Sequence, residues 1–378
     1  MLASHSRHPH YVLTMPLDSA APTLAPPAAR PRTAAPRAVA LWLLGVALLV
    51  FLMVALGGAT RLTGSGLSIM EWAPLSGTLP PLSEAEWQRL FDLYRTIPQY
   101  QLQNAGFGME GFRQIFWLEW LHRFWGRLIG LAYATGLAWF WLRGTIPAGW
   151  KPRLLGLLAL GGLQGAIGWY MVASGFDAGR TEVSPYRLVL HLGLALVIFA
   201  ALVWSALTLL HPTGRAGPEV RRVRLAVRAT FALVALAMLA GGFVAGIRAG
   251  FSYNSFPLMD GALVPAGYLD LDPWWRNLTA NVASVQFNHR LLATLAGLAA
   301  LAAVALALSD LPRGSARRAV LALGAAVGAQ YLLGVLTLIH VVPVGLGTLH
   351  QAMAVVVLAA ALVALHGLRT GKPEARIG

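Results

Sequence analysis

The 378-residue sequence contains no cysteine. This absence excludes disulfides, thiolate metal sites and thioether attachment of a c-type heme, and it leaves the loops without covalent cross-links. Any transition metal must then be held by other side chains. Histidine is the best remaining ligand for that purpose, and the chain has 10 of them.

Charged residues are also scarce. They make up 12% of the chain, against 57% hydrophobic residues, and the mean hydropathy is +0.62. A soluble domain with this composition could not cover its own surface, so we expect an all-α polytopic membrane protein. About eight apolar stretches approach the roughly 20 residues that cross a bilayer as a helix. They lie near residues 38–57, 117–142, 153–173, 187–210, 226–247, 287–308, 317–340 and 347–367.

Acidic residues are the scarcer charge, 15 against 29 basic residues, which gives a net charge of +14. Such a charge can indicate a nucleic-acid binder, but here the basic residues cluster in the tails and in loops on one side of the predicted helices. Arg221 and Arg222 follow the fourth stretch, for example, whereas Asp177 and Glu182 precede it. The positive-inside rule then places both termini in the cytoplasm, with the lipid bilayer and no nucleic acid as partner.

The two ends and the middle of the chain have the composition of connecting segments. Residues 1–37 are rich in Ala, Pro and Arg and predict a disordered cytoplasmic tail rather than a signal peptide. Residues 211–225 form a basic cytoplasmic linker, and 368–378 a second cytoplasmic tail. The overall composition favours a bacterial inner membrane over the mitochondrial inner membrane.

Landmarks in the first half of the chain recur in the same order in the second half. The corresponding pairs are Gly57-Gly58 and Gly241-Gly242, His122-Arg123 and His289-Arg290, Gln164 and Gln330, and His191 and His350. Each half has an even number of predicted spans, so the halves share one orientation. We therefore expect two parallel-repeated four-helix bundles, at 38–210 and 226–367, with two equivalent sites.

The first outer loop, about 58–116, is long for a connection. Within it, Ser83-Glu84-Ala85-Glu86 matches a capping box, and Trp87, Leu90, Phe91 and Tyr94 follow at helical spacing. This pattern predicts an amphipathic helix in the outer membrane interface, where it could cover a site.

Four histidines, His122, His191, His289 and His350, lie a few residues inside the outer ends of the even-numbered spans. A lone histidine in a membrane helix is most often a polar group bonded to a neighbouring carbonyl. Four histidines at one depth, repeated across a duplication, instead indicate metal or heme, because buried ionisable residues are costly in a membrane and mark function. The histidines outside this set receive no role; they are His5, His8, His10, His211, His340 and His366.

Heme is favoured over a bare metal because clustered carboxylates are absent around these positions. Glycines near them could let the helices admit a flat macrocycle, although ordinary helix packing explains most of them equally well. They are Gly126, Gly130, Gly161, Gly162, Gly165, Gly168 and Gly193. Arg61, Arg123, Arg248 and Arg290 are candidate contacts for heme propionates, with interfacial snorkelling as the alternative.

The two halves differ next to the first histidine of each. Glu119 stands three residues before His122, whereas Gln286 stands three before His289. If one site performs chemistry, the half with the carboxylate is the better candidate, because proton transfer needs an ionisable group. The alternative for Glu119 is an ion pair with Arg123 or Arg113.

These motifs resemble the heme A synthase family, and in particular its cysteine-free branch. The resemblance is carried by Gly57-Gly58-Ala59-Thr60-Arg61-Leu62-Thr63-Gly64-Ser65-Gly66-Leu67-Ser68, Glu71-Trp72, Glu119-Trp120-Leu121-His122-Arg123, His191, Asn288-His289-Arg290 and Leu349-His350-Gln351. It covers residues 38 to 368. It implies oxidation of a methyl group of heme O to the formyl group of heme A, for cytochrome oxidase biogenesis.

The resemblance also implies roles for individual residues. His289 and His350 would ligate a resident heme b, while His122 and His191 would face the heme O substrate and Glu119 would serve the chemistry. Implied partners are the farnesyltransferase that makes heme O, cytochrome oxidase assembly factors and an unidentified electron acceptor or donor. A homo-oligomer is left open.

Two other functions compete with the enzyme. A diheme b-type cytochrome would only move electrons, to or from quinone, and would hold two permanent hemes b. A transporter or heme-handling scaffold would use the repeat as a transport path and would leave Glu119 dispensable.

Overall fold

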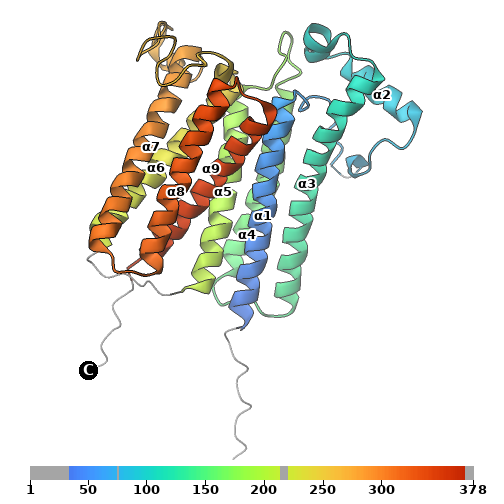
Figure 1. Ribbon diagram of the computed structural model, residues 1–378. Coiled ribbons are helices and arrows are strands. Elements are labelled where there is room, and N and C mark those ends of the chain that lie inside the picture. The colour runs from blue at the N-terminus through green and yellow to red at the C-terminus, as the bar shows by residue number, and fades with distance from the viewer. Residues whose placement is uncertain (1–33, 75, 213–219, 371–378) are drawn as a thin grey trace, which may run out of the picture.

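The computed structural model describes residues 34–74, 76–212 and 220–370, and its long elements there are all helices. The helices are α1 Ala34–Leu62, α2 Glu84–Tyr94, α3 Met109–Leu142, α4 Lys151–Ala173, α5 Pro185–Leu210, α6 Arg221–Gly246, α7 Val282–Asp310, α8 Ser315–Ile339 and α9 Val344–Gly367. All except the short α2 stand side by side in one bundle (Figure 1). The all-α polytopic class is confirmed.

Seven of the described helices are long and apolar enough to cross a membrane. These are α1 and α4 to α9, so the chain is a multi-pass membrane protein. The remaining long helix, α3, has 34 residues and runs alongside α1 (Figure 1). Its first turns carry charged residues, and Arg, Trp and Gly residues follow, so α3 is not among these seven helices. The eighth span therefore stays a prediction.

The expected boundaries shift at several points. Helix α1 begins at Ala34, so the last residues of the segment expected to be disordered, 1–37, are helical, while 1–33 lie outside the described residues. The first outer connection is shorter than the expected 58–116, because α1 continues to Leu62 and α3 starts at Met109. The linker expected at 211–225 ends where α6 begins at Arg221.

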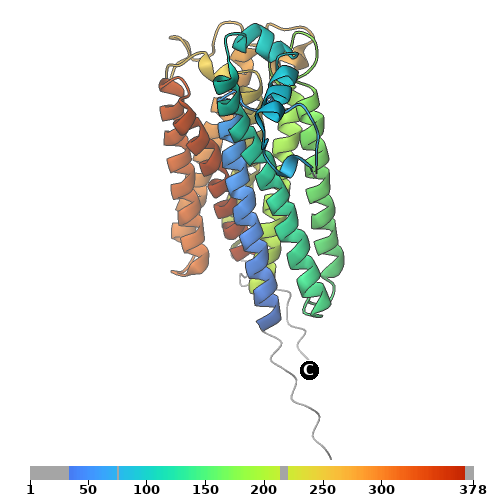
Figure 2. The ribbon, with the colours of Figure 1, turned by 90° about the vertical axis from the view of Figure 1, so that its right-hand side faces the viewer.

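Helices α1, α5, α6 and α9 form the centre of the bundle. Helix α1 packs against α5 and α9, and α6 packs against the same two helices. Helices α3 and α4 flank this centre on one side, and α7 and α8 flank it on the other (Figures 1 and 2). Each pairing in one half has its counterpart in the other, as the proposed duplication requires.

The apolar core follows the same division. One buried cluster joins α1, α4, α5 and α9 around Leu43, Leu154 and Leu202, and a second joins α6, α7, α8 and α9 around Val227 and Leu323. Helix α9 contributes to both clusters and so ties the halves together.

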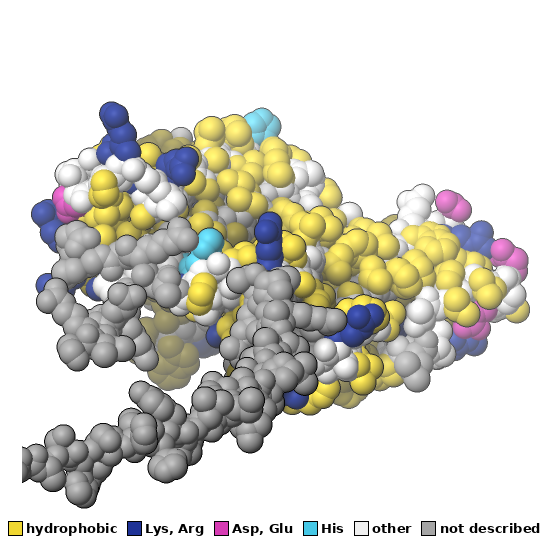
Figure 3. Space-filling view, turned by 90° about the horizontal axis from the view of Figure 1, so that it is seen from below, with side chains coloured by type: hydrophobic (Ala, Val, Ile, Leu, Met, Phe, Trp, Pro, Cys, Tyr) yellow, Lys and Arg dark blue, Asp and Glu magenta, His cyan; other side chains and the backbone are white. Residues whose placement is uncertain are grey.

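The two ends of the bundle differ in charge. Helix α1 begins and α9 ends at the same end of the bundle (Figure 1). Viewed from that end, Lys and Arg side chains lie around a largely hydrophobic surface (Figure 3). This arrangement agrees with the positive-inside argument, and the cytoplasmic placement of both termini remains a prediction from it.

The capping-box prediction is confirmed by α2. The Ser83 side chain accepts a hydrogen bond from the Glu86 amide, and Trp87, Phe91 and Tyr94 are buried. Their apolar face packs against the outer part of α3, in a cluster with Phe112, rather than against lipid. The helix is amphipathic because it docks on the protein.

An ion-pair network fastens α2 to the loop before it. Arg89 donates to both carboxylate oxygens of Glu71, at 2.9 and 2.8 Å, and also bonds Glu86. Hydrogen bonding from Arg89 lowers the pKa of the Glu71 and Glu86 carboxyls. Both carboxylates therefore stay ionised in mildly acidic solution, and the network weakens only when the pH falls through these lowered pKa values.

Candidate functional site

Each of the four histidines packs over a glycine on a neighbouring helix. A Cβ atom added to Gly57, Gly168, Gly241 or Gly334 would lie 3.1, 2.9, 3.0 or 2.8 Å from the Cε1 atom of His122, His191, His289 or His350, respectively. These glycines lie on α1, α4, α6 and α8. The contacts at Gly168 and Gly334 are shorter than real Cβ contacts, and those at Gly57 and Gly241 are tighter than most. The four glycines therefore seat the imidazole rings, and the pattern is the same in both halves.

The two glycine pairs that mark the repeat thus have two structural roles. Their first members, Gly57 and Gly241, seat a histidine of the same half. Their second members face the other half, since a Cβ on Gly58 would lie 2.9 Å from Gln351 Oε1, and one on Gly242 would lie 3.0 Å from Val189 Cγ2. The motif fixes both the histidine and the contact between halves.

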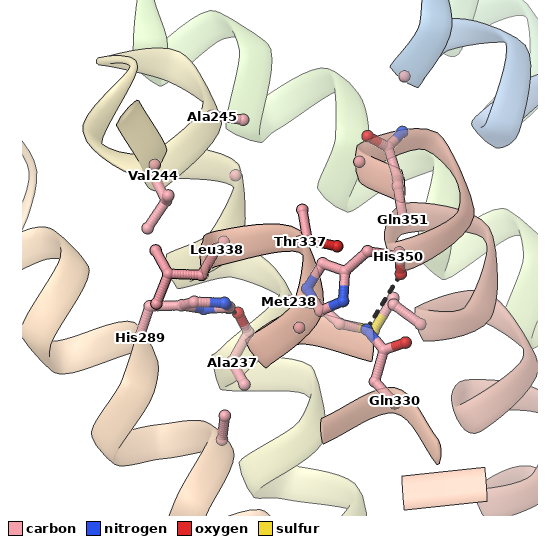
Figure 4. Close-up of a pocket in the computed structure, with 18 of the residues that line it drawn as sticks. Ala237, Met238, Val244, Ala245, His289, Gln330, Thr337, Leu338, His350 and Gln351 are labelled. Carbon is pink, nitrogen blue, oxygen red and sulfur yellow. Dashed lines mark hydrogen bonds between the residues drawn. The ribbon is translucent and has the colours of Figure 1, made fainter. Parts of the chain in front are cut away.

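In the second half, His289 and His350 line a cavity of ≈ 290 Å³. Their imidazoles project into it from α7 and α9 (Figure 4). The His289 Nδ1–H donates to the Ala237 carbonyl at 3.0 Å, which leaves the lone pair on Nε2 free. Two buried imidazoles on facing helices can supply the two axial nitrogens of one heme iron.

A glutamine accompanies the second histidine of each half. Gln164 Nε2 donates to the backbone carbonyl of His191, and Gln330 Nε2 to that of His350, both at 3.0 Å (Figure 4 shows the latter). The Oε1 atoms of both glutamines are buried without a hydrogen-bond partner. The sequence showed these glutamines only as landmarks of the repeat, and their contact with the histidine helix was not foreseen.

His122 and His191 occupy the equivalent positions in the first half. Gln164 Nε2 also lies 3.2 Å from Nδ1 of the His191 ring. The Nδ1 atom of His122 is buried and unpartnered, as is that of His350. Orphaned imidazole nitrogens on glycine-seated rings fit a ligand that completes the polar contacts, so both pairs fit a porphyrin iron in donor type.

Glu119 is 2% exposed and fully hydrogen-bonded. Its Oε2 accepts from the Ser68 hydroxyl at 2.7 Å and from the Ile69 amide at 2.8 Å, and its Oε1 accepts from both Arg123 Nε and Nη2. The alternative pairing with Arg123 is therefore present. Arg113 instead pairs with Glu84.

Gln286 makes equivalent contacts in the second half, but it donates hydrogen bonds to its outer loop where Glu119 accepts them. Its Oε1 accepts from Arg290 at 2.8 Å, as Glu119 does from Arg123, but its Nε2 donates to the carbonyls of Ala249 and Ser252. In each half the side chain three residues before the histidine thus ties an outer loop to the following arginine. The loop in the first half offers donors, and only a carboxylate can accept from all of them.

The four arginines proposed for propionates are committed to other groups. Arg123 and Arg290 donate to carbonyls of the outer loops, those of Glu71 and Ser255 among others. Arg61 and Arg248, one from each half, both bind Glu182, at 3.3 and 2.9 Å. Arg61, Arg248 and Arg290 do line the second-half cavity, whereas Arg123 lines a different space on the far side of α3. Glu182 was missed at the sequence level, because nothing local marks it as a bridge between halves.

The glycines that were expected to admit a macrocycle divide into two groups. Gly168 seats His191, and Gly126 and Gly193 contact Met53 and Leu239. Gly130, Gly161, Gly162 and Gly165 face open space, with no neighbouring atom within 4 Å of an added Cβ. Gly161, Gly165 and Gly168 share one face of α4, the face that carries His191's seat.

The seat at Gly334 can be tested directly. We expect Gly334→Ala to push the His350 ring by roughly 0.7 Å, the shift that restores ordinary carbon contact, and so to lower the heme content of the purified protein, read from the Soret absorbance per chain. Gly328→Ala is the matched control on α8, because its added methyl group meets open space. Equal heme content in both variants would contradict the seat.

Comparison with known proteins follows the geometry. Residues 40–362 match the family described as "Cytochrome oxidase assembly protein". A heme A synthase of Granulibacter bethesdensis is 54% identical over 331 residues, covering 88% of this chain and 87% of the relative. Those of Azorhizobium caulinodans and Rhodospirillum centenum are 52% and 48% identical, over 90% and 91% of this chain and 95% and 92% of their own lengths.

Proposed function

Since this chain belongs to the heme A synthase family of cytochrome oxidase assembly proteins, we propose that it oxidises a methyl group of heme O to the formyl group of heme A. The conversion of methyl plus one water to formyl releases four electrons and four protons, two of the protons from the methyl carbon and two from the water that supplies the oxygen atom. It passes through an alcohol and a hydrated aldehyde that loses water. The electrons leave to an external redox partner, so the protein is an oxidoreductase.

We assign the second half to the resident cofactor, heme b, between His289 and His350. Here the Tyr331 hydroxyl on α8 lies 3.0 Å from the Thr294 hydroxyl on α7, so a hydrogen bond bridges these two helices beside the cavity that Tyr331 lines. A bound heme b would supply electron transfer, while the two imidazoles hold it and Gln330 fixes the histidine helix. Arg61, Arg248 and Arg290 are the candidate propionate contacts at this cavity.

We assign the first half, with His122 and His191, to the substrate. The repeat aligns Gly165 with Tyr331 and Arg127 with Thr294, so the tyrosine and threonine that join α7 to α8 have no counterpart between α3 and α4. Gly161 and Gly165 leave open space there instead. This difference carries the proposal, because a substrate must enter and leave whereas a cofactor stays. The open face between α3 and α4 suits a hydrophobic molecule arriving from the bilayer.

In this proposal Glu119 supports the oxidation by holding neighbouring residues in place and by placing a negative charge near His122. Its carboxylate holds Arg123 and the loop at Ser68 and Ile69 beside His122. The network keeps a negative charge one helical turn from the substrate histidine. That negative charge stabilises the protons that each two-electron oxidation step releases. It also stabilises positive charge that develops during the step.

The cellular setting follows from the same proposal. We place the protein in a bacterial inner membrane, next to the farnesyltransferase that makes heme O and to the assembly factors that pass heme A to cytochrome oxidase. The bacterial sources of its relatives support this setting.

Heme extraction tests the function. Protein co-produced with a heme O synthase should yield heme b together with heme O or heme A on chromatography. We expect Gly165→Tyr, which installs the residue of the closed half, to retain heme b and to lose the heme O and heme A. A Tyr side chain there would fill the space next to His191.

The matched control is Gly156→Tyr, which also adds a ring at an open position on α4 but toward its inner end. It should leave all hemes unchanged. Recovery of heme b alone from the unaltered chain would refute the synthase and favour a diheme cytochrome.

A further inference from the structure

The segment between α1 and α2 folds down beside α3 instead of staying above the bundle. The light-blue stretch in Figure 1 descends along the outer side of α3 and then climbs to α2. Gly77 marks its lower part, because a Cβ there would lie 3.1 Å from Arg127 Nη2. Residues 76–78 form a short helical turn at this level.

The helix residues at the level of Gly77 and Arg127 give the depth of the segment in the membrane. Gly126, next to Arg127 on α3, lies opposite Met53 on α1, with 3.4 Å between an added Cβ and the Met53 side chain. Met53 is nine residues before Leu62, the outer end of α1. A rise of 1.5 Å per residue places this level roughly 14 Å below that end. It lies about 6 Å inside the predicted end of the span at residue 57, and so within a hydrocarbon core of about 30 Å.

The segment has the composition for that depth. Residues 72–82 read Trp-Ala-Pro-Leu-Ser-Gly-Thr-Leu-Pro-Pro-Leu and contain no charged side chain. Leu79 is 68% exposed within the protein and Trp72 is 46% exposed, so the fold leaves most of the Leu79 surface and nearly half of the Trp72 surface without a partner. Trp72 also contacts Trp169 on α4, at 5.8 Å between ring centroids, four residues inside that helix's outer end.

Irregular backbone at membrane depth needs partners for its carbonyl groups, since lipid offers none. Two arginines of α3 provide them. Arg127 donates to the Ala73 carbonyl at 2.8 Å and to the Pro74 carbonyl at 2.9 Å, while Arg123 donates to the carbonyls of Ile69 and Glu71. Four carbonyl groups of this irregular chain are thereby satisfied by side chains from one helix face.

We propose that residues 72–74 and 76–82 belong to a re-entrant segment, inserted into the outer leaflet, whose apolar side chains contact lipid acyl chains. Arg127 holds the carbonyls of Ala73 and Pro74, and Arg123 holds those of Ile69 and Glu71 just before the segment. Lipid acyl chains of the bilayer cover the exposed surface of Leu79. This location does not depend on the reaction proposed above, because it rests on depth, on composition and on hydrogen bonds about 100° around α3 from His122.

Spin labels can measure the depth. The chain has no cysteine, so a single cysteine at Leu79 can carry a nitroxide in the full-length protein reconstituted into phosphatidylcholine vesicles. Leu131, 61% exposed on α3, is the membrane reference, and exposed Gln88 on α2 is the aqueous reference. Collision with oxygen reports lipid exposure, and collision with a water-soluble nickel chelate reports water exposure.

We expect the oxygen-to-nickel ratio at 79 to equal that at 131 and to exceed that at 88. Arg127→Leu should shift the ratio at 79 to the value at 88, because two carbonyls lose their donors and the segment leaves the membrane. Arg95→Leu removes an exposed ion pair with Asp92 and a cation–π contact with Phe91, both within α2 and its C-cap, and should not shift the ratio.

Three results would overturn the proposal. The first is an aqueous ratio at 79 in the unaltered chain. The second is exclusion of both reagents, which would mean that a second protein copy covers the segment. The third is a ratio that Arg127→Leu leaves unchanged, which would remove the role of the arginine.

Discussion

Glu119→Gln is expected to lower heme A formation at least ~100-fold, a loss typical of removing a group that assists proton movement. The carboxylate accepts from Ser68, Ile69 and Arg123 together. A glutamine can present its oxygen to Arg123, but its N–H₂ group then faces the Ile69 N–H, donor against donor. The charge is lost and the loop beside His122 is released. Chromatography of heme extracts from cells that co-produce heme O synthase measures the effect.

Heme b should survive in this variant, since Glu119 lies in the other half from His289 and His350. Glu119→Asp keeps the charge but shortens the side chain, so partial recovery with an altered pH profile is expected. A purely structural residue would show no such change in the pH profile. Full activity of Glu119→Gln would contradict the assignment of Glu119.

His289→Ala is expected to remove the resident heme b almost completely. The imidazole is oriented by its bond to the Ala237 carbonyl and by its seat on Gly241, and no other histidine in the described part of the chain lines that cavity except His350. One remaining axial nitrogen cannot hold the iron in the six-coordinate, low-spin state. The reduced α-band absorbance per chain and the low-spin electron paramagnetic resonance signal should both fall.

Two histidine variants are the controls for this result. His340→Ala alters an exposed residue at the end of α8 and should leave heme b unchanged. His122→Ala should keep heme b and lose bound heme O. The reverse outcome, heme b lost from His122→Ala and kept in His289→Ala, would exchange the roles of the two halves.

The sequence by itself determined the helices, the duplication and the four histidines at one depth. These features follow from local periodicity, from long apolar runs and from repeated motifs, all of which are properties of neighbouring residues. The capping box before α2 was equally local, and the helix begins where it predicts. The glycine pairs were visible as a repeat, but the histidine seats were not, because Gly57 and His122 lie 65 residues apart in the printed numbering.

The tertiary structure decided what each polar side chain binds. Arg61 and Arg248 looked alike at two helix ends, and only the packing of the halves brings both to Glu182. Arg123 follows a histidine in the sequence, yet it points about 100° around α3 from it, toward the outer loop. Apolar periodicity fixes which faces are buried, but a guanidinium finds its partner by three-dimensional proximity. The position of Ala73 and Pro74 beside α3 depends on that proximity alone, since both are held by Arg127, and no local pattern encodes it.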